Sequence, residues 1–554
     1  MKLNVLLLSI GLLMTAACSQ SSSQDTSDEP TEPSINDIKT QSLEVSKPQP
    51  DAPAVKLPAL KTPPPAELEK RGAYWVDVAR DCDGYPRMNL STPAGLCIGL
   101  VASKETPSKD GKAGLKFPRD ILIPHPDDTF SNEIYVTDMG GWAENRGRLL
   151  LINDGQIETV LEGLNLPHAI EYGPDGGVYI AETDKINRVY IPPSRYDGFG
   201  TNPIITNLPY KTSNKLHLHP LKAFSFLDTN TILVNSGSVS DRCEKFIQKG
   251  VCEEPNNTGA VLKFVKDGQR WTLIETDTAK GLRNSMGLTT HASGTVLQAG
   301  NGSDYKDPNS PHEDLNVINE GQFYGWPYCY DQDSSDPDWA GSAFDCTTTG
   351  QKHSPPIRLL PPHGAPLDLL YAPKGTLGFK SEKLIVPLHG HRKTGHRILM
   401  FDVDAKGLPN AEAVELVSEW AAQETGPRGA PVGLTVGHDG SIWGVEDKNK
   451  TIFRIAKDAY KPARWGKTPS HISLKDDGTY AALQASIFLK NCASCHEEFS
   501  GAPNRSLNTL AKLGWLDEES AILDRVLAKP PKRMPPAAPL SDPEIQKIKQ
   551  WLTK

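Results

Sequence analysis

The chain has 554 residues, of which 38% are hydrophobic and 23% are charged, and its formal net charge is −9 at pH 7. These proportions are typical of a soluble globular protein, and the length exceeds the roughly 150 residues of one ordinary domain. The acidic balance argues against nucleic acid as a partner, because phosphate recognition requires an excess of clustered cations.

The N-terminus has the pattern of an export signal. Lys2 is followed by an apolar run from Val5 to Met14, and small residues precede Cys18. This order resembles a bacterial lipoprotein signal over residues 1–18, in which the Cys becomes the lipidated first residue of the mature chain. An ordinary secretory signal is the alternative. We expect an exported, periplasmic protein held by its lipid anchor, and Ser19 favours the outer membrane.

Residues 19–67 form a segment of different composition, rich in Ser, Thr, Pro, Asp and Glu and poor in large apolar residues. Such a segment cannot bury enough apolar surface to offset the entropy lost when it becomes ordered. We therefore predict a disordered tether. A flexible chain of about fifty residues has an end-to-end distance of roughly 40 Å, so the folded part would stand off the membrane.

Between residues 72 and 460 a unit recurs that consists of a short apolar run, a turn and a second apolar run. The clearest copies span residues 169–182 and 432–445, and their Asp-Gly turns favour hairpins because Gly tolerates positive φ. Weaker copies and two further starts bring the number of units to about six. We predict a mainly-β fold, a six-bladed β-propeller. Because the repeats are irregular in length, a pair of β-sandwiches is the alternative.

Residues 470–554 differ in kind, because their apolar residues recur at helical spacing on both sides of one motif. That motif, Cys492-Ala-Ser-Cys495-His496, is the C-x-x-C-H pattern of covalent haem attachment. We predict a small all-α cytochrome c domain that carries one haem c. Cys492 and Cys495 would bind the haem, and His496 would be the proximal ligand of the iron.

Met534 is the predicted sixth ligand of the haem iron. It is the only Met after Met400, and no His follows His496. A Met in a Pro-rich loop before the last helix resembles the distal side of small class I cytochromes c. A core Met beside a five-coordinate iron is the alternative. His/Met ligation raises the reduction potential, which suits a haem that accepts electrons.

Six cysteines remain after Cys18, Cys492 and Cys495 are assigned. An even number in an exported protein indicates disulfides, although the sequence leaves many connectivities open. Proximity in the chain favours three local pairs, and we predict these. They are Cys82–Cys97, Cys243–Cys252 and Cys329–Cys346.

Five cations fall where the inner strands of the propeller should begin and should face its central channel. In a net-acidic chain this placement indicates an anionic ligand at the centre. The alternative is that each cation pairs with a nearby acid such as Asp120, Asp304, Glu313 or Asp314. The five cations are Arg119, Lys222, Arg283, Arg392 and Arg428.

Four motifs in the propeller are more specific. Together they resemble the glucose/sorbosone dehydrogenase family, which comprises soluble six-bladed quinoproteins that use pyrroloquinoline quinone (PQQ) and calcium. The resemblance covers roughly residues 72–460, and the fused cytochrome resembles known two-domain members. It implies a sugar or aldehyde dehydrogenase that passes electrons from PQQ to its own haem and then to a cytochrome or oxidase. The motifs are Gly281–Asn284, Phe323–Tyr328, His363–Pro366 and His389–Arg397.

The resemblance also implies roles for single residues. The family's catalytic base is a His three residues before a cation, which here is His219 before Lys222; His168 and His217 are the rivals. A neutral imidazole suits the removal of a hydroxyl proton. Where the family has Arg-Asn, this chain has Lys222-Ala223, and Lys grips carboxylates less specifically than Arg. The residues implied to bind PQQ are Lys222, Arg283, Asn284, Arg392 and Arg428, with Arg283 also in a catalytic role.

Calcium in this family is held largely by backbone carbonyls of one loop. The matching region here is 301–316, and Asp307 and Pro308 come nearest to the pattern. Two other functions remain as alternatives: a calcium-dependent propeller lactonase, and a non-catalytic propeller that docks a redox partner. The attached cytochrome and the Arg283-Asn284 pair weigh against hydrolysis, because hydrolysis needs no electron acceptor.

Overall fold

The computed structural model describes residues 66–459 and residues 545 and 546. Within the first range, positions 113, 127, 129, 131, 132, 154, 195, 196, 343, 348–352, 391–393, 419 and 421–427 are not described. The predicted signal, the haem ligands, Arg392 and the tether up to residue 65 lie outside the described residues and stay predictions. Glu67, the last residue of the predicted tether, is hydrogen-bonded to Asp77 and Val78 beside β2. In the described part of the chain, no helix is long and apolar enough to cross a membrane.

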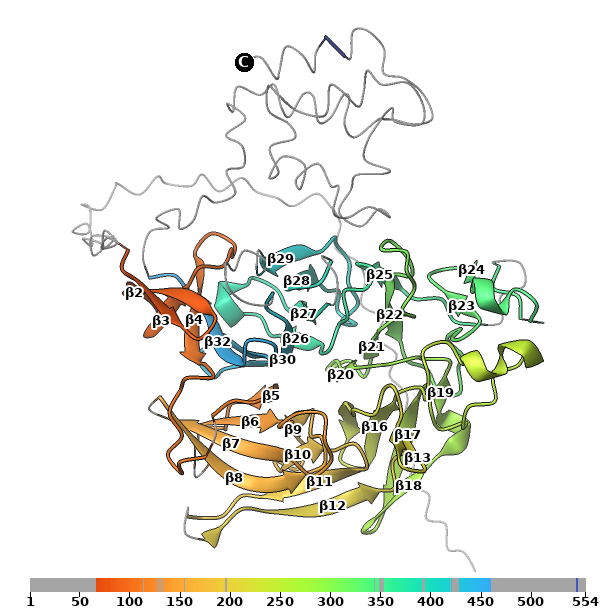
Figure 1. The fold of residues 1–554 in the computed structure, drawn as a ribbon, viewed down its shortest axis with the longest axis horizontal. Coiled ribbons are helices and arrows are strands. Elements are labelled where there is room, and N and C mark those ends of the chain that lie inside the picture. Colours follow the sequence, from red (N-terminus) through yellow and green to blue (C-terminus); the bar gives the residue numbers. More distant parts are fainter. Residues whose placement is uncertain are drawn as a thin grey trace, which may run out of the picture. The chain divides into compact units, whose positions relative to one another are not determined.

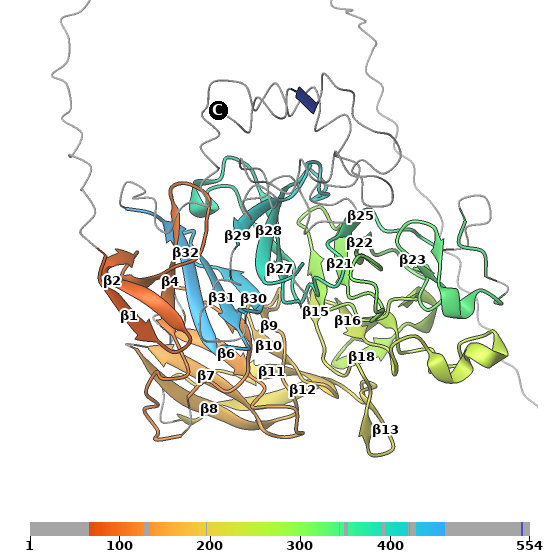
Figure 2. The same cartoon turned by 45° about the horizontal axis from the view of Figure 1, so that its top comes forward.

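The described residues form a mainly-β propeller, in which antiparallel sheets surround a centre (Figures 1 and 2). Five sheets have the form of regular blades, and Figure 1 shows their first strands towards the centre and their last strands at the periphery. The first blade comprises β5 (Pro118–Leu122), β6 (Ile134–Asp138), β7 (Gly147–Asn153) and β8 (Gln156–Leu164). The second comprises β9 (Ile170–Tyr172), β10 (Val178–Ala181), β11 (Lys185–Tyr190) and β12 (Gly200–Thr206).

The next three blades follow in chain order. The third comprises β15 (Phe224–Asp228), β16 (Thr231–Ser236), β17 (Ala260–Asp267) and β18 (Arg270–Leu273), with β19 (Ala279–Lys280) paired to β17. The fourth comprises β20 (Gly287–Thr290), β21 (Val296–Gly300), β22 (Glu313–Val317) and β25 (Arg358–Leu360). The fifth comprises β26 (Leu370–Ala372), β27 (Lys383–Leu388), β28 (Arg397–Asp402) and β29 (Val414–Val417).

The remaining large sheet joins both ends of the described propeller. It has seven strands in the order β1-β2-β3-β4-β32-β31-β30, so that β4 and β32 pair antiparallel and close the ring. The sequence predicted six similar units, whereas the structure has five regular blades and this larger composite sheet. Its strands are β1 (Leu68–Arg71), β2 (Tyr74–Cys82), β3 (Tyr85–Met88), β4 (Leu96–Ala102), β30 (Pro431–Val436), β31 (Ile442–Glu446) and β32 (Thr451–Lys457).

Small elements decorate the blades. They are the strand pairs β13 (Lys211–Thr212) with β14 (Lys215–Leu216) and β23 (Cys329–Tyr330) with β24 (Ser334–Ser335), and the short 3-10 helices η2 (Glu244–Lys249), η3 (Glu275–Asp277), η4 (Pro337–Trp339) and η5 (Thr376–Gly378). The core lies between neighbouring sheets, and second strands such as β6 are buried along their whole length. Such strands carry apolar residues on both faces because each blade packs against two others.

All three predicted disulfides are confirmed. Cys82–Cys97, Cys243–Cys252 and Cys329–Cys346 have Cα–Cα separations of 5.7, 5.9 and 5.6 Å. Each closes a short loop, and a disulfide of this kind stabilises a folded domain by about 2–4 kcal/mol. The Cys82–Cys97 bridge links β2 to β4, within the sheet that closes the propeller.

Candidate active site

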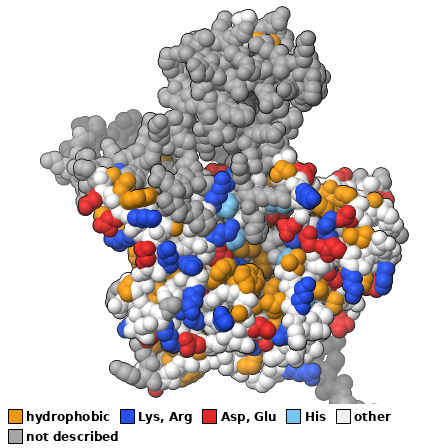
Figure 3. All heavy atoms as spheres, in the orientation of Figure 1, with side chains coloured by type: hydrophobic (Ala, Val, Ile, Leu, Met, Phe, Trp, Pro, Cys, Tyr) orange, Lys and Arg blue, Asp and Glu red, His pale blue; other side chains and the backbone are white. Residues whose placement is uncertain are grey.

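A cavity of about 390 Å³ lies where the inner strands begin. Leu221, Met286, Phe117 and Leu367 line it and also belong to a small apolar cluster. Other walls are polar and come from several blades, with the side chains of Arg119, His219, Arg283, Asn284, Glu313, His363, His389, Asp447 and Lys448. Figure 3 shows the hollow in this face, with hydrophobic side chains among histidines and cations. An apolar floor with convergent polar groups is typical of a ligand site.

His219 lies on this cavity, with one ring nitrogen held by the protein. Its Nδ1 is 2.8 Å from the Ser238 hydroxyl, and that hydroxyl donates its own proton to the Ser240 carbonyl at 2.6 Å. Ser238 must therefore accept from the Nδ1–H of His219, which assigns the tautomer from the hydrogen-bond network. Within the described part of the chain Nε2 has no hydrogen-bond partner, so its lone pair can accept from a bound hydroxyl.

Two features keep the His219 imidazole neutral and close to Ser238. Burial, with the positive charge of Arg283 as a second cause, holds the pKa of His219 well below its ordinary value. A Cβ on Gly237 would lie 2.3 Å from the Cβ of His219, so only glycine permits the close approach of the two segments. A neutral, oriented imidazole of this kind can accept a proton.

Arg283 is held between two blades by acids and carbonyls. Its guanidinium pairs with Asp241 at 2.6 Å and with Asp304 at 3.3 Å, and it donates to the Asn301 carbonyl at 3.1 Å. The alternative that the cations pair with nearby acids is thus confirmed for Arg283 and Asp304. Arg119 pairs instead with Asp447, an acid that the sequence did not indicate. Both guanidinium groups nevertheless line the cavity.

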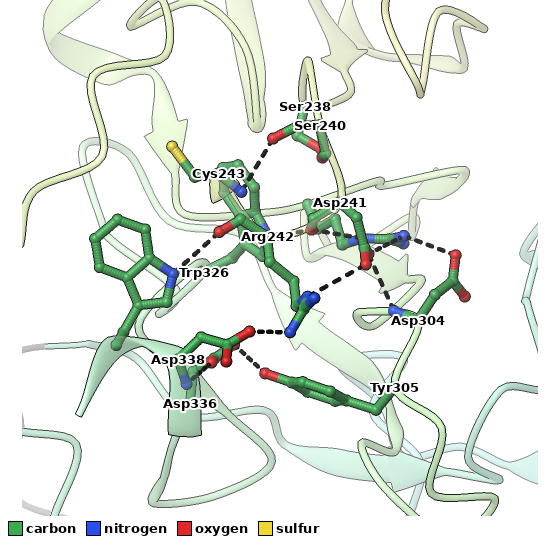
Figure 4. A network of polar contacts seen from close by, with 12 residues as sticks. Ser238, Ser240, Asp241, Arg242, Cys243, Asp304, Tyr305, Trp326, Asp336 and Asp338 are labelled. Atoms are coloured by element: carbon green, nitrogen blue, oxygen red, sulfur yellow. Dashed lines mark hydrogen bonds and ion pairs between the residues drawn. The ribbon is translucent and has the colours of Figure 1, made fainter. Parts of the chain in front are cut away.

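The turn that carries Ser238 and Asp241 is braced from outside the cavity (Figure 4). Arg242 lies 3.5 Å from Asp241, pairs with Asp338, and is stacked over Tyr305 with 5.2 Å between guanidinium and ring centre. The indole of Trp326 donates to the Asp241 carbonyl at 3.0 Å. Because Ser238 contacts His219 and Asp241 contacts Arg283, this network fixes the two groups relative to one another.

A His–Asp–Arg arrangement on the opposite wall was missed by the sequence analysis. His389 Nε2 lies 2.9 Å from Asp447, which also binds Arg119. Burial raises the pKa of Asp447, but its contact with His389 and the nearby charges of Arg119 and Lys448 outweigh burial and leave the pKa below its usual value. One signal was present: Asp138, Glu182 and Asp447 are acids at or directly after the end of a second strand.

Behind Arg283 lies a second, smaller hollow lined by side-chain oxygens. Asn301, Asp314 and Asn316 line it, and each has a buried Oδ1 without a hydrogen-bond partner among the described residues. The Nδ2 of Asn316 donates to Gln298 at 2.9 Å, so its orphaned atom is the acceptor oxygen. Three buried acceptors without donors fit an oxygen-preferring cation such as calcium. The described residues contain no group of three or more His, Cys, Asp or Glu that could hold a metal.

The structure brings some of the predicted calcium and cofactor residues to the cavity and leaves others away from it. Asn284 lines the cavity with His219 and Arg283. Asp307 and Pro308 are exposed and do not line it, although His363, which does, lies 2.8 Å from the Asp307 carbonyl. Arg428 is partly exposed and is also absent from the lining.

Lys222 turns away from the cavity. Its side chain is fully buried, with 0% exposure, and its ammonium donates to the Pro220 carbonyl at 2.8 Å. Burial lowers the pKa of Lys222 to about 7. Its neighbour Leu221 lines the cavity, whereas the ammonium of Lys222 reaches back to the carbonyl two residues before it.

Neither rival of His219 reaches the cavity in the described part of the chain. His168 is buried, and both of its ring nitrogens lack a hydrogen-bond partner among the described residues. His217 contacts Thr212 at 3.0 Å and lines a neighbouring groove. Geometry therefore favours His219 among the three candidates.

Known proteins resemble both the propeller and the C-terminal part of the chain. Residues 481–552 match the protein family described as cytochrome c oxidase, cbb3-type, subunit III, which confirms a C-terminal cytochrome c domain and indicates haem. An uncharacterised protein of Borreliella burgdorferi is 24% identical over 390 residues, which cover 65% of this chain and 95% of that protein.

Solved structures match the propeller. The holo form of the pyranose dehydrogenase PQQ domain from Coprinopsis cinerea is 20% identical and covers 68% of this chain and 100% of its own, with a TM-score of 0.50. A calcium structure of an AA12-family carbohydrate-active enzyme from Trichoderma reesei is 19% identical and covers 68% of this chain and 98% of its own, with a TM-score of 0.50. At these identities the likeness establishes the fold.

The chain is thus a mainly-β propeller joined to a cytochrome c domain. The structural neighbours of the propeller include the PQQ domain of a pyranose dehydrogenase, in agreement with the sequence motifs.

Proposed function

We propose that this protein is a PQQ-dependent sugar dehydrogenase that passes electrons to its own covalently bound c-type haem. The observation that carries the proposal is His219, a neutral base whose Nε2 has no partner among the described residues, on a cavity that Arg283 and Asn284 also line. If the seven-stranded sheet counts as the sixth blade, the propeller has the blade number expected for this class of enzyme.

The residues of the cavity suit both ligands of such a reaction. The apolar floor suits a flat ring system, while Arg119, Arg283 and Lys448 would face its carboxylates. Bound PQQ would supply the hydride acceptor. The chain itself would place the reacting hydroxyl against His219 Nε2, which takes the proton, while Ser238 keeps the imidazole in the reactive tautomer.

Reconstitution tests this function. The full chain with haem is incubated with PQQ and calcium, and a panel of aldoses and simple alcohols is added while the visible haem spectrum and a redox dye are followed. We expect one or more sugars to reduce both the haem and the dye, and omission of PQQ to abolish both. If no sugar or alcohol reduces either acceptor, the dehydrogenase proposal is wrong.

We also propose that calcium binds at the buried oxygens of Asn301, Asp314 and Asn316. Calcium at about 100 times its Kd should raise the free energy of unfolding by about 2.7 kcal/mol, because it binds only the folded state. We expect the thermal midpoint to rise with calcium and to fall with a chelator. Asp314→Ala should abolish this dependence.

The matched control for the calcium measurement is Glu320→Gln, which removes an exposed carboxylate that pairs with Lys263. This variant should keep the calcium-dependent rise of the thermal midpoint. The same rise in Asp314→Ala as in the wild type would contradict the site.

A further inference from the structure

An open groove continues from the cavity past His219. It has a volume of about 450 Å³ and shares Trp142, Leu218 and Pro220 with the lining of the cavity. Trp142 is 57% exposed and Leu218 is 51% exposed, which is unusual for side chains of this size. Leu218 is adjacent to His219 in the chain, so the groove begins beside the proposed base.

The loop that carries Trp142 is held in place from beneath. Buried Asp138 accepts from the backbone N–H groups of Gly140 at 2.8 Å and of Phe117 at 3.0 Å, and it pairs with Arg148 at 2.7 Å. A Cβ on Gly140, at φ +71°, would lie 2.2 Å from the Arg146 carbonyl oxygen. The exposed indole is therefore presented by a fixed turn.

Further contacts tie the Trp142 loop to its surroundings. Glu144, from the Trp142 loop, accepts from the hydroxyl of Tyr210 at 2.8 Å and from the ammonium of Lys211 at 2.7 Å, which lie at the base of the β13–β14 hairpin. Phe117 supports the indole edge-on, with 6.3 Å between ring centres. The loop is thus tied to the β13–β14 hairpin, and the exposed ring of Trp142 packs against Phe117.

The polar groups of the groove are hydrogen-bonding side chains rather than one cluster of charge. Lys215 and Glu244 are exposed on it, and Asp241 and Ser240 lie deeper. A fixed aromatic ring beside separate donors and acceptors suits a pyranose, because a sugar ring presents an apolar C–H face and a rim of hydroxyls. A protein partner with an apolar surface would leave the hydrogen-bonding groups of the groove unused.

We propose that this groove binds the second and following residues of an oligosaccharide whose end residue reacts beside His219. The inference rests on the proposed dehydrogenase function and names its substrate class: short glycan chains rather than free monosaccharides alone. Trp142 would be the specificity-determining residue, stacked against the sugar ring next to the reacting one.

Two measurements on the full chain test the groove. The first is the ratio of kcat/KM for a trisaccharide, maltotriose or cellotriose, to kcat/KM for glucose, measured with the redox dye. Trp142→Ala should lower this ratio about tenfold, the size of one lost aromatic contact, and Trp142→Phe should keep most of it. Trp75→Ala removes another exposed indole, 42% exposed on β2 and outside the groove, and should leave the ratio unchanged.

The second measurement does not depend on oxidation. Binding of the reduced trisaccharides maltotriitol and cellotriitol is followed by calorimetry without PQQ, and Trp142→Ala should weaken it about tenfold. If no sugar reduces the haem, the dehydrogenase proposal fails, and this binding alone decides whether the groove is a saccharide site. Absence of binding to the wild type overturns the inference.

Two kinetic outcomes would also contradict the proposal that the groove binds an oligosaccharide. One is an equal loss for glucose and trisaccharide in Trp142→Ala. The other is slower haem reduction with both sugars while dye reduction is intact, which would make the groove a docking surface for a protein domain.

Discussion

Replacement of His219 by Ala should lower sugar-driven reduction of both haem and dye by about 10²–10⁴-fold, the usual contribution of a general base. The physical reason is the loss of the His219 imidazole, whose Nδ1 is held by Ser238 and whose Nε2 has no partner in the described part of the chain. Binding of PQQ, followed by its absorption spectrum, should change little, because the proposed carboxylate-facing cations are retained.

The pH dependence of the wild-type enzyme follows from the same residue. The pKa of His219 lies well below its ordinary value, so the imidazole stays unprotonated to lower pH than a free histidine would. We therefore expect kcat/KM to decrease on the acid side only at a pH below ~6.5, the ordinary pKa of histidine. The unfolded chain binds the proton more tightly, so this group reduces the free energy of unfolding as pH falls below that value.

Ser238→Ala provides a matched variant, because it leaves the imidazole and removes only the group that fixes its tautomer. This variant should lower kcat by a smaller factor than His219→Ala does. It should also shift the acid limb of the pH profile of kcat/KM. If His168→Ala abolishes activity while His219→Ala is active, the base has been assigned to the wrong histidine. The mechanism itself would survive that result.

The parts of the fold that could be predicted from the sequence are those with local signals. Hairpin turns such as the one between β9 and β10 can be predicted from an Asp-Gly pair between alternating apolar residues. The closing sheet could not be predicted in the same way, because β4 pairs with β32 across more than 300 residues. No local pattern records which distant strands will pair, and residues 68–88 add strands outside the repeat.

The candidate site was predictable to a similar extent. His219 and Arg283 follow from motifs and spacing, and the structure places both on one cavity. The His389–Asp447 contact joins residues 58 positions apart, from different sheets, and only the closed ring brings them together. Lys222 shows that a residue can be placed correctly in the chain while the direction of its side chain is not predicted. It has the expected charge at the expected place in the chain, but its ammonium bonds to the Pro220 carbonyl and does not line the cavity.

The short linker between the propeller and the cytochrome c domain is consistent with the proposed role of the haem as electron acceptor. Residues 461–469 form a short, proline-bounded segment. A short tether raises the effective concentration of an attached acceptor to around the millimolar range. Oxidation of one hydroxyl releases two electrons, whereas one haem accepts one. A haem that serves as the acceptor must therefore pass its electron on to a cytochrome or oxidase between the two transfers.

Met534→Ala should lower the haem reduction potential, because it removes the thioether proposed as the sixth ligand. A lower potential weakens the driving force for electron entry, so sugar-driven haem reduction should slow or stop. Dye reduction should be retained, because the cavity with His219 and Arg283 is untouched. A redox titration and the loss of the weak absorption band of the iron–sulfur bond would report the ligand directly.

The pattern of loss in this variant separates three roles of the cytochrome domain. Loss of haem reduction with dye reduction intact makes the haem the electron acceptor of the propeller. Equal loss of both means that the domain serves the stability of the whole chain, which the thermal midpoint would also reveal. An unchanged potential means that Met534 is not the sixth ligand.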